Sequence, residues 1–292
     1  MAIFGRLLTA MVTPFDSNLK VDRNKTEELV EHLISTGTTA VVVAGTTGES
    51  PTLTSQEKLD LFRHVVEIVN GRIPVIAGTG SNNTAASIEL TQKAEEIGVD
   101  GIMLVVPYYN KPSQEGIYQH FKTIASSTKL PVMLYNIPGR SVINMAVDTV
   151  ARLANDVENI VALKEANADL TQMAEIIDRT PENFSLYTGD DKMTIPCMAV
   201  GGDGVVSVAS HIIGNEMTEM INLFLSGENQ KASALHRKLL PIFEGIFITS
   251  NPSPIKAALA LKGLEVGGVR LPLVECNEKE TNYLQGLIND LQ

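Results

Sequence analysis

The stretch Asn159–Ile160–Val161–Ala162–Leu163–Lys164–Glu165–Ala166–Asn167 joins a short apolar run to a charged end. A continuous apolar run of this length is typical of a strand buried on both faces, as in parallel sheets. Lys164 stands where that strand would end. Burial lowers the pKa of a lysine and frees its amine to attack a carbonyl, whereas most lysines at strand ends extend their charge into water. This stretch alone leaves both interpretations open.

The run at 160–163 is one of eight along the chain, and longer amphipathic segments separate them. This alternation predicts βα units, and eight of them predict an α/β fold of the (β/α)8 TIM barrel type. An open doubly wound sheet is the alternative, but Gly78–Thr79–Gly80 lacks the third glycine of a dinucleotide fingerprint. We expect strands at 7–12, 40–44, 74–77, 101–106, 131–135, 160–163, 184–187 and 204–208, with helices at 24–35, 55–70, 84–97, 114–126 and 170–179.

The segment after the last run reads as helices at 216–225, 229–247, 254–262 and 278–292. The turn at 250–254, which contains two prolines, separates two of them. We therefore predict a catalytic barrel over residues 1–224 and a C-terminal helical region over 225–292 that packs on the barrel.

Composition and charge limit the partners. The 292 residues are 44% hydrophobic, enough for a large core, and the net charge of -11 argues against nucleic acid or an anionic membrane surface as partner. No uncharged run approaches the ~18 residues of a membrane span. The apolar segment 1–15 carries Arg6 inside the run and no small-residue cleavage site follows, so we do not interpret it as a signal peptide. Cys197 and Cys276 are far apart and indicate reduced thiols in a cytoplasmic protein.

Other nucleophiles and metal ligands have little support. No Gly-x-Ser-x-Gly segment occurs, and Cys197 lies in an apolar segment that indicates a core position. The histidines never pair at ligand spacing, so we predict no metal; they are His32, His64, His120, His211 and His236. Lys164 is therefore the strongest candidate nucleophile at a strand end.

Polar residues follow several of the predicted strands, whose carboxyl ends form the active-site face of such barrels. In Gly45–Thr46–Thr47–Gly48, hydroxyls and backbone N–H groups could bind a small carboxylate, or the segment could be a tight turn. Tyr135 and Tyr109 could transfer protons, although buried tyrosines usually pack. Arg140 could hold a carboxylate with two hydrogen bonds, although surface arginines are more common.

Four motifs together resemble the pyruvate-dependent class I aldolase superfamily in order and spacing, over essentially the whole chain. They are Gly45–Thr46–Thr47–Gly48–Glu49–Ser50, Pro107–Tyr108–Tyr109–Asn110, Tyr135–Asn136–Ile137–Pro138 with Arg140, and Lys164–Glu165–Ala166. Within the superfamily, the sequence is similar to the 4-hydroxy-tetrahydrodipicolinate synthase family of lysine and diaminopimelate biosynthesis.

The resemblance implies a lyase that condenses pyruvate with L-aspartate-4-semialdehyde and uses no cofactor beyond an imine of pyruvate with Lys164. Tyr135 would donate and accept protons, with Thr46 and Tyr109 completing a relay. The protonated imine withdraws electrons and makes the pyruvate methyl carbon nucleophilic at neutral pH.

The resemblance also assigns binding roles and an assembly. Thr47 and the main chain at Val206 would hold pyruvate, and Arg140 would hold the carboxylate of the semialdehyde. In the family, the counterpart of Tyr109 crosses a tight-dimer interface, which implies a homodimer or a homotetramer built as a dimer of dimers.

Two alternatives stay open. One is an N-acetylneuraminate or keto-deoxy-sugar aldolase, which shares the lysine and the tyrosine; the double threonine Thr46–Thr47 and Arg140 favour the synthase. The other is a catalytically idle barrel that senses a small acid. An idle relative would have no need to keep Lys164, Tyr135, Thr46, Tyr109 and Arg140 together.

The sequence departs from the family pattern near Lys164 and at a regulatory pocket. Asn167 stands where the lysine motif often continues with threonine. Members inhibited by lysine carry two histidines and a glutamate at positions that here are Ser55, Lys58 and Ala86, while Ser50, Asn82 and Tyr108 remain. A possible vestigial effector pocket has therefore lost a carboxylate and gained a cation.

We predict weak or absent inhibition by L-lysine, because the Lys58 ammonium would repel the charge of the ligand. Initial rates measured over a range of L-lysine concentrations test this prediction. A sub-millimolar inhibition constant would contradict it.

Overall fold

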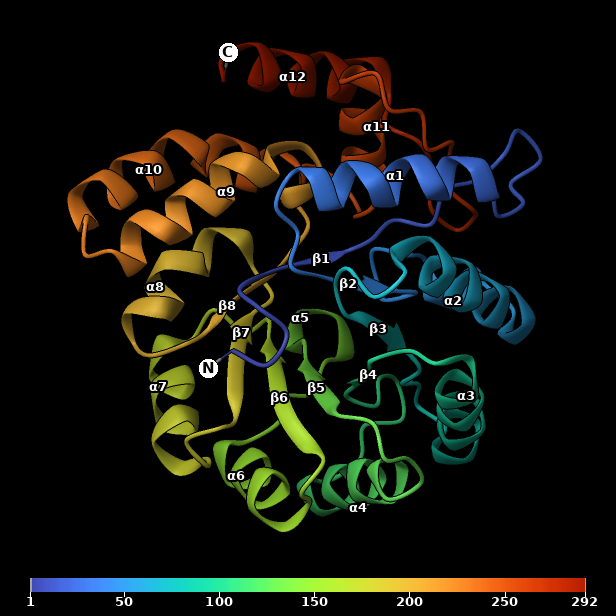
Figure 1. Cartoon of the computed structure of the whole chain (residues 1–292), viewed down its shortest axis with the longest axis vertical. Helices are drawn as coiled ribbons and strands as arrows, with labels where there is room; N and C mark the ends of the chain where they lie inside the picture. The colour runs from blue at the N-terminus through green and yellow to red at the C-terminus, as the bar shows by residue number, and fades with distance from the viewer. Residues whose placement is uncertain (1, 292) are drawn as a thin grey trace.

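The computed structural model describes residues 2–291, and its centre is a closed barrel of parallel strands (Figure 1). Each predicted apolar run overlaps one strand, so the predicted barrel is confirmed. The runs end in turns or helix starts because their flanking glycines, prolines and polar residues interrupt the apolar pattern. The strands are β1 (Leu7–Ala10), β2 (Ala40–Val43), β3 (Val75–Gly78), β4 (Gly101–Val105), β5 (Val132–Asn136), β6 (Ile160–Glu165), β7 (Ser185–Thr188) and β8 (Gly204–Ser207).

The sheet closes because β1 pairs in parallel with both β2 and β8. Leu8 lies opposite Ala40 on one side and opposite Val206 on the other. The alternative of an open doubly wound sheet is therefore wrong. Closure brings the carboxyl ends of all eight strands into one ring, where side chains far apart in the sequence can meet.

Helices surround the barrel and continue past it (Figure 1). Several begin at capping residues: Thr54 and Glu57 form a capping box at the start of α2, and Ser113 and Asp169 cap α4 and α7. The helices are α1 (Arg23–Ser35), α2 (Ser55–Val69), α3 (Thr84–Ile97), α4 (Gln114–Ala125), α5 (Pro138–Ser141), α6 (Val147–Asp156), α7 (Leu170–Arg179), α8 (Thr194–Ala199), α9 (Ser210–Leu225), α10 (Asn229–Gly245), α11 (Ser253–Leu261) and α12 (Glu278–Asn289).

Helix α9 begins earlier than the sequence predicts, at Ser210 and not at residue 216. The helix has non-helical dihedral angles at Ile213, just before Gly214, which explains why the local pattern reads as a break. A Cβ atom at Gly214 would lie 2.5 Å from the carbonyl oxygen of Thr36. The glycine is therefore required by the close approach of α9 to the end of α1.

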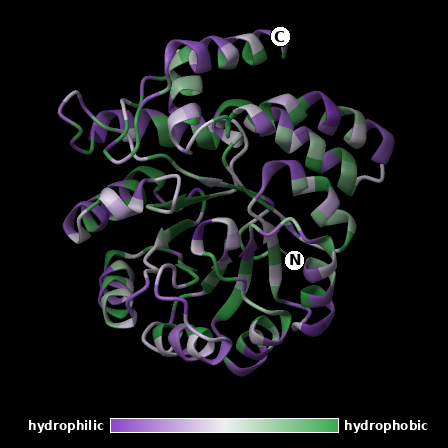
Figure 2. Ribbon diagram, turned by 180° about the vertical axis from the view of Figure 1, so that it is seen from behind, coloured by the Kyte–Doolittle hydropathy of each residue, from purple (hydrophilic) through white to green (hydrophobic). Residues whose placement is uncertain are grey.

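Side chains alternate between the barrel interior and the layer under the helices, because successive residues of a strand point to opposite faces. Met133 and Tyr135 of β5, Ala162 of β6 and Tyr187 of β7 belong to the interior cluster. A larger cluster fills the space between strands and helices. Figure 2 shows the same division as hydrophobic strands at the centre and hydrophilic segments on the surrounding helices.

The C-terminal helices return to the carboxyl end of β2 through a buried ion pair. Lys256 Nζ of α11 lies 2.7 Å from Glu49 Oε1 in the loop after β2, and the two side chains are 3% and 0% exposed. The backbone N–H of Arg270 donates to the other oxygen of Glu49 at 2.9 Å, and its guanidinium pairs with Glu57. Both cations also contact the ring of Phe15. The tail is thus fixed to the loop that carries Thr46 and Thr47, while its treatment as a separate region over 225–292 stays a prediction.

No helix within residues 2–291 is long and apolar enough to span a membrane.

Replacing Lys256 by methionine should lower the free energy of unfolding by about 3–5 kcal/mol, because the Glu49 carboxylate would be left buried without its cation. Chemical unfolding followed by circular dichroism measures the loss. The double variant with Glu49→Gln should recover part of it, since no buried charge then lacks a partner. A loss below about 1 kcal/mol in the single variant would mean that the pair behaves as an exposed one.

Candidate active site

Lys164 lies inside the barrel at the carboxyl end of β6. Ala162 faces the interior, so the residue two positions later faces it too. Lys164 pairs in register with Tyr135 on β5 and with Tyr187 on β7, and only 5% of it is exposed. The expectation of a surface lysine with its head in water is therefore wrong for this residue.

Burial lowers the pKa of Lys164 to about 8. The Asp191 carboxylate opposes this shift, and the Arg140 guanidinium adds to it. The amine also lies 4.4 Å from the centroid of the Tyr135 ring. At neutral pH a sizeable fraction of this lysine is unprotonated, which is the form that attacks a carbonyl.

Gly189, just after β7, provides the space through which the Lys164 side chain runs. A Cβ atom at this position would lie 2.9 Å from Lys164 Cε and 2.8 Å from the Cβ of Ala166. Any larger residue would displace the lysine or the backbone. The sequence alone gives no indication of this role for Gly189, because its contact with Lys164 exists only once β6 and β7 are paired.

Tyr135 stays protonated beside the lysine. Burial raises the pKa of its phenol to about 12, while a hydrogen bond with the Thr46 side chain acts in the opposite direction. A neutral phenol can donate a proton to a developing oxyanion and recover it from a neighbouring hydroxyl. The predicted neighbours Lys164, Tyr135 and Thr46 thus form one group.

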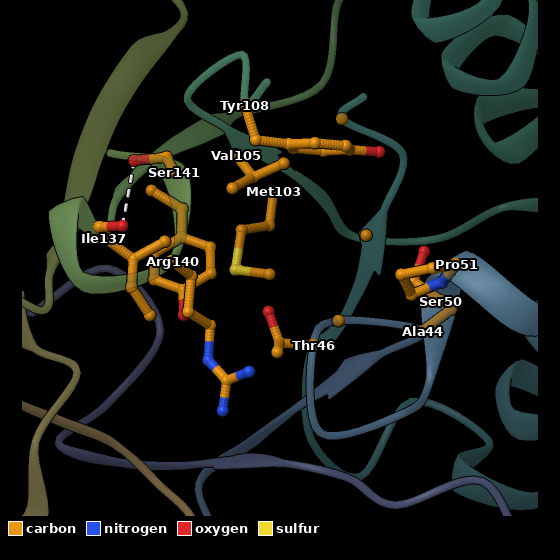
Figure 3. Close-up of a pocket in the computed structure, with 14 residues that line it drawn as sticks. Ala44, Thr46, Ser50, Pro51, Met103, Val105, Tyr108, Ile137, Arg140 and Ser141 are labelled. Atoms are coloured by element: carbon orange, nitrogen blue, oxygen red, sulfur yellow. Dashed lines mark hydrogen bonds between the residues drawn. The ribbon is translucent and has the colours of Figure 1, made fainter. Parts of the chain in front are cut away.

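A cavity of about 240 Å³ opens next to this group. Among the predicted residues it exposes Thr46, Tyr135, Arg140, Ser50 and Tyr108. Figure 3 shows the guanidinium of Arg140 and the side chain of Thr46 directed into the same space. Helix α5 positions Arg140: Pro138 starts this short helix and the Ser141 hydroxyl donates to the Ile137 carbonyl at 2.9 Å. The space suits a small substrate with a carboxylate.

Thr47 and Val206 are buried and are not among the residues that line that cavity. Thr47 is 3% exposed, and its hydroxyl accepts a hydrogen bond of 2.9 Å from the side chain of Asn251. Val206 faces the barrel interior from β8. Asn251 lies in the predicted turn at 250–254. The sequence around this turn gives no indication of the contact with Thr47.

Asp191 is a second residue to which the sequence analysis gave no role. It is 1% exposed and accepts hydrogen bonds from the Ser207 hydroxyl at 2.5 Å and from the backbone N–H groups of Val208 and Ala209 at 3.2 Å. Burial raises its pKa to about 6. This carboxylate holds the end of β8 and stabilises a positive charge on Lys164.

Glu165 faces away from the interior and holds β6 to its neighbours. It is fully buried and accepts hydrogen bonds from Asn136, Gln172 and the backbone N–H of Asn167. Burial raises the pKa of Glu165 to about 7. The unusual Asn167 therefore supports this network with a backbone group that any non-proline residue supplies.

The residues of the predicted effector pocket lie on α2, on α3 and after the strands β2, β3 and β4. Ser50 and Tyr108 reach the cavity, and the Asn82 side chain donates to the Tyr108 carbonyl at 3.1 Å. Ser55 and Lys58 lie on α2, and Ala86 lies on α3. Lys58 is partly buried, and burial lowers its pKa.

Tyr109 is the one predicted catalytic residue that does not join the group. It is 89% exposed, has a positive φ of 72°, and is not among the residues that line the cavity. Within residues 2–291, no cluster of three or more histidine, cysteine, aspartate or glutamate side chains could hold a metal ion.

A desolvated lysine beside a neutral phenol, at the carboxyl end of a closed (β/α)8 barrel, defines a lyase of the Schiff-base class. A family model described as the dihydrodipicolinate synthetase family matches residues 3–291. The chain belongs to this family.

Similar proteins cover the chain almost end to end. The 4-hydroxy-tetrahydrodipicolinate synthase 1 of Halalkalibacterium halodurans is 61% identical over 98% of this chain and 96% of its own length. The 4-hydroxy-tetrahydrodipicolinate synthase of Bacillus subtilis is 57% identical over 99% of both. The crystal structure of a dihydrodipicolinate synthase from Bacillus anthracis is 60% identical over 99% of each chain, with a TM-score of 0.97.

The rate of imine formation should rise with pH and reach half its maximum near pH 8, because the neutral form of Lys164 is the nucleophile. Asp191→Asn should move this midpoint to lower pH by about one unit, since the carboxylate that raises the Lys164 pKa is lost. Stopped-flow measurement of pyruvate adduct formation gives both midpoints. Asp190→Asn is the matched control, and a midpoint near 10.5, the ordinary value for lysine, would contradict the assignment.

Proposed function

We propose that this chain is a 4-hydroxy-tetrahydrodipicolinate synthase, which condenses pyruvate with L-aspartate-4-semialdehyde through an imine on Lys164. The observation that carries the proposal is the buried Lys164 amine next to the Tyr135 phenol inside the barrel. The names of the relatives support the synthase over a sugar-acid aldolase and over a barrel without activity.

In the proposed reaction the Lys164 amine attacks the ketone carbon of pyruvate, and water leaves as the imine forms. Tyr135 supplies the proton that the departing oxygen needs. Transfer of a methyl proton to the Tyr135 phenolate then gives an enamine, whose carbon attacks the aldehyde of the second substrate. Thr46 connects Tyr135 to the cavity, so the phenol can be reprotonated between steps.

The carboxylates of the two substrates would bind at separate places. Pyruvate would bind at Thr47 and the backbone of Val206; both residues are buried, and Val206 belongs to the interior cluster that also contains Tyr135 and Ala162. Arg140 is exposed at the other side of the cavity and suits the carboxylate of the semialdehyde (Figure 3).

We also propose that the working enzyme is a homodimer or a dimer of dimers. Tyr109 supports this proposal, because an aromatic side chain that is 89% exposed on a left-handed backbone position gains little within one chain. In a dimer it would enter the site of the second copy and complete the relay with Thr46. A sedimentation mass of a single chain, 31.5 kDa, would contradict this proposal. A cytoplasmic location fits the unpaired Cys197 and Cys276 and belongs to the same proposal.

Borohydride reduction in the presence of pyruvate should leave a stable adduct on Lys164, found by peptide mass analysis. Lys256 is an internal control: burial also lowers its pKa to about 8, but its amine is bound to Glu49 and to the Gly268 carbonyl. We therefore expect no adduct on Lys256. An adduct on Lys256, or none on Lys164, would contradict the mechanism.

The second substrate is identified by comparing kcat/KM for aspartate semialdehyde and for sugar aldehydes with the same enzyme. Preference for the semialdehyde by at least about a hundredfold is expected, because Arg140 in the cavity can pair with its carboxylate, a group that a neutral sugar aldehyde lacks. Preference for a sugar aldehyde would favour the aldolase alternative.

A further inference from the structure

Asn251 is a buried side chain from the C-terminal region that reaches the proposed pyruvate site. It lies between α10 and α11, 204 residues from Thr47 in the sequence, and is 5% exposed. Its side-chain N–H donates to Thr47 Oγ1 at 2.9 Å. This contact is the one hydrogen bond that the Thr47 hydroxyl makes within residues 2–291.

The direction of this hydrogen bond fixes what the Thr47 hydroxyl can do. A hydroxyl has one hydrogen to donate and can accept through its oxygen lone pairs. Because Asn251 occupies the oxygen as a donor, the hydrogen of Thr47 is turned away from Asn251 and stays available. A hydroxyl in this state is a donor for a carboxylate oxygen.

Among the residues that the structure describes, only one end of the Asn251 side-chain amide, its N–H, has a hydrogen-bond partner. Its side-chain oxygen is buried and has no partner within the described part of the chain. A buried unpaired carbonyl costs free energy, and such groups are uncommon in folded proteins. Packing and stability alone therefore do not account for an amide at this position.

The backbone on both sides of the contact is held in place. Lys256 follows Asn251 by five residues and Glu49 follows Thr47 by two, and this buried pair ties the start of α11 to the loop after β2. On the other side of that loop, the Thr13 hydroxyl donates to the Gly48 carbonyl at 2.7 Å. Asn251 and Thr47 are thus presented to each other by fixed segments.

We propose that Asn251 is a positioning residue for pyruvate, which orients the Thr47 hydroxyl as a hydrogen-bond donor toward the substrate carboxylate. This inference rests on the proposed function, which places pyruvate at Thr47. It assigns the C-terminal region a part in substrate binding that is separate from its part in stability.

The test compares Asn251→Asp with Asn251→Ala. Aspartate has the shape of asparagine, but its carboxylate accepts the Thr47 hydrogen and adds a negative charge next to pyruvate. The KM for pyruvate should rise by about tenfold or more in Asn251→Asp, and by only about threefold in Asn251→Ala, where the hydroxyl can rotate freely. The KM for the semialdehyde should stay within twofold of the wild type in both variants.

A purely structural role predicts the reverse order, because the isosteric aspartate would disturb the fold less than alanine. In a Thr47→Val background, the difference between the two Asn251 variants should shrink to the part caused by repulsion between the aspartate charge and pyruvate, since no hydroxyl is left to orient. Asn159→Ala is the matched control: the Asn159 side chain donates to three backbone carbonyls far from Thr47, so its loss should lower stability and leave the pyruvate KM unchanged.

Equal pyruvate KM values for the aspartate and alanine variants, or a difference of undiminished size in the Thr47→Val background, would overturn the inference. Thermal unfolding of each variant confirms that folded protein is compared. Failure of the inference is distinguishable from failure of the proposed function, because the wild-type adduct on Lys164 is scored in a separate experiment.

Discussion

Closure of the barrel is the constraint on which the site depends. Once β1 pairs with β8, alternate residues of every strand face a closed interior without water, and Lys164 and Tyr135 are on that face because Ala162 and Met133 are. The lysine is then desolvated by the fold itself. Burial in the barrel is enough to lower the pKa of Lys164. Its neighbours then only adjust this pKa and leave the amine without a hydrogen-bond partner among residues 2–291.

Lys164 and Lys256 differ in the hydrogen-bond and charge partners of their amines more than in their burial. Burial lowers the pKa of Lys164 and of Lys256 to about 8. Lys256 binds the Glu49 carboxylate and a backbone carbonyl, so its lone pair has no path to a substrate. The Lys164 amine faces the ring of Tyr135. The Asp191 carboxylate raises the pKa of Lys164 electrostatically and also accepts hydrogen bonds from the end of β8. A lowered pKa therefore marks a candidate nucleophile only where the amine is also unoccupied.

The sequence predicts those parts of the molecule that depend on local pattern. Apolar runs locate all the strands, and polar residues after them locate Lys164, Tyr135, Thr46 and Arg140, since strand ends share one face of a barrel. Contacts between distant segments were not predicted: Asn251 to Thr47 spans 204 residues and Lys256 to Glu49 spans 207. The start of α9 was missed for the same reason, because the approach of Thr36 decides the role of Gly214.

The C-terminal helices also stabilise the conformation of the loop after β2. Glycines at both ends let Thr46 and Thr47 approach a small anion, but they also leave the loop with little intrinsic stiffness. Glu49 takes a left-handed conformation at φ 55°, which costs a residue with a Cβ atom some strain. Its carboxylate is held by Lys256 and by the backbone N–H of Arg270, so the tail compensates for that strain and fixes the loop. A barrel of this sequence without its tail would keep Lys164 buried and would lose the contacts of Asn251, Lys256 and Arg270 with the loop after β2.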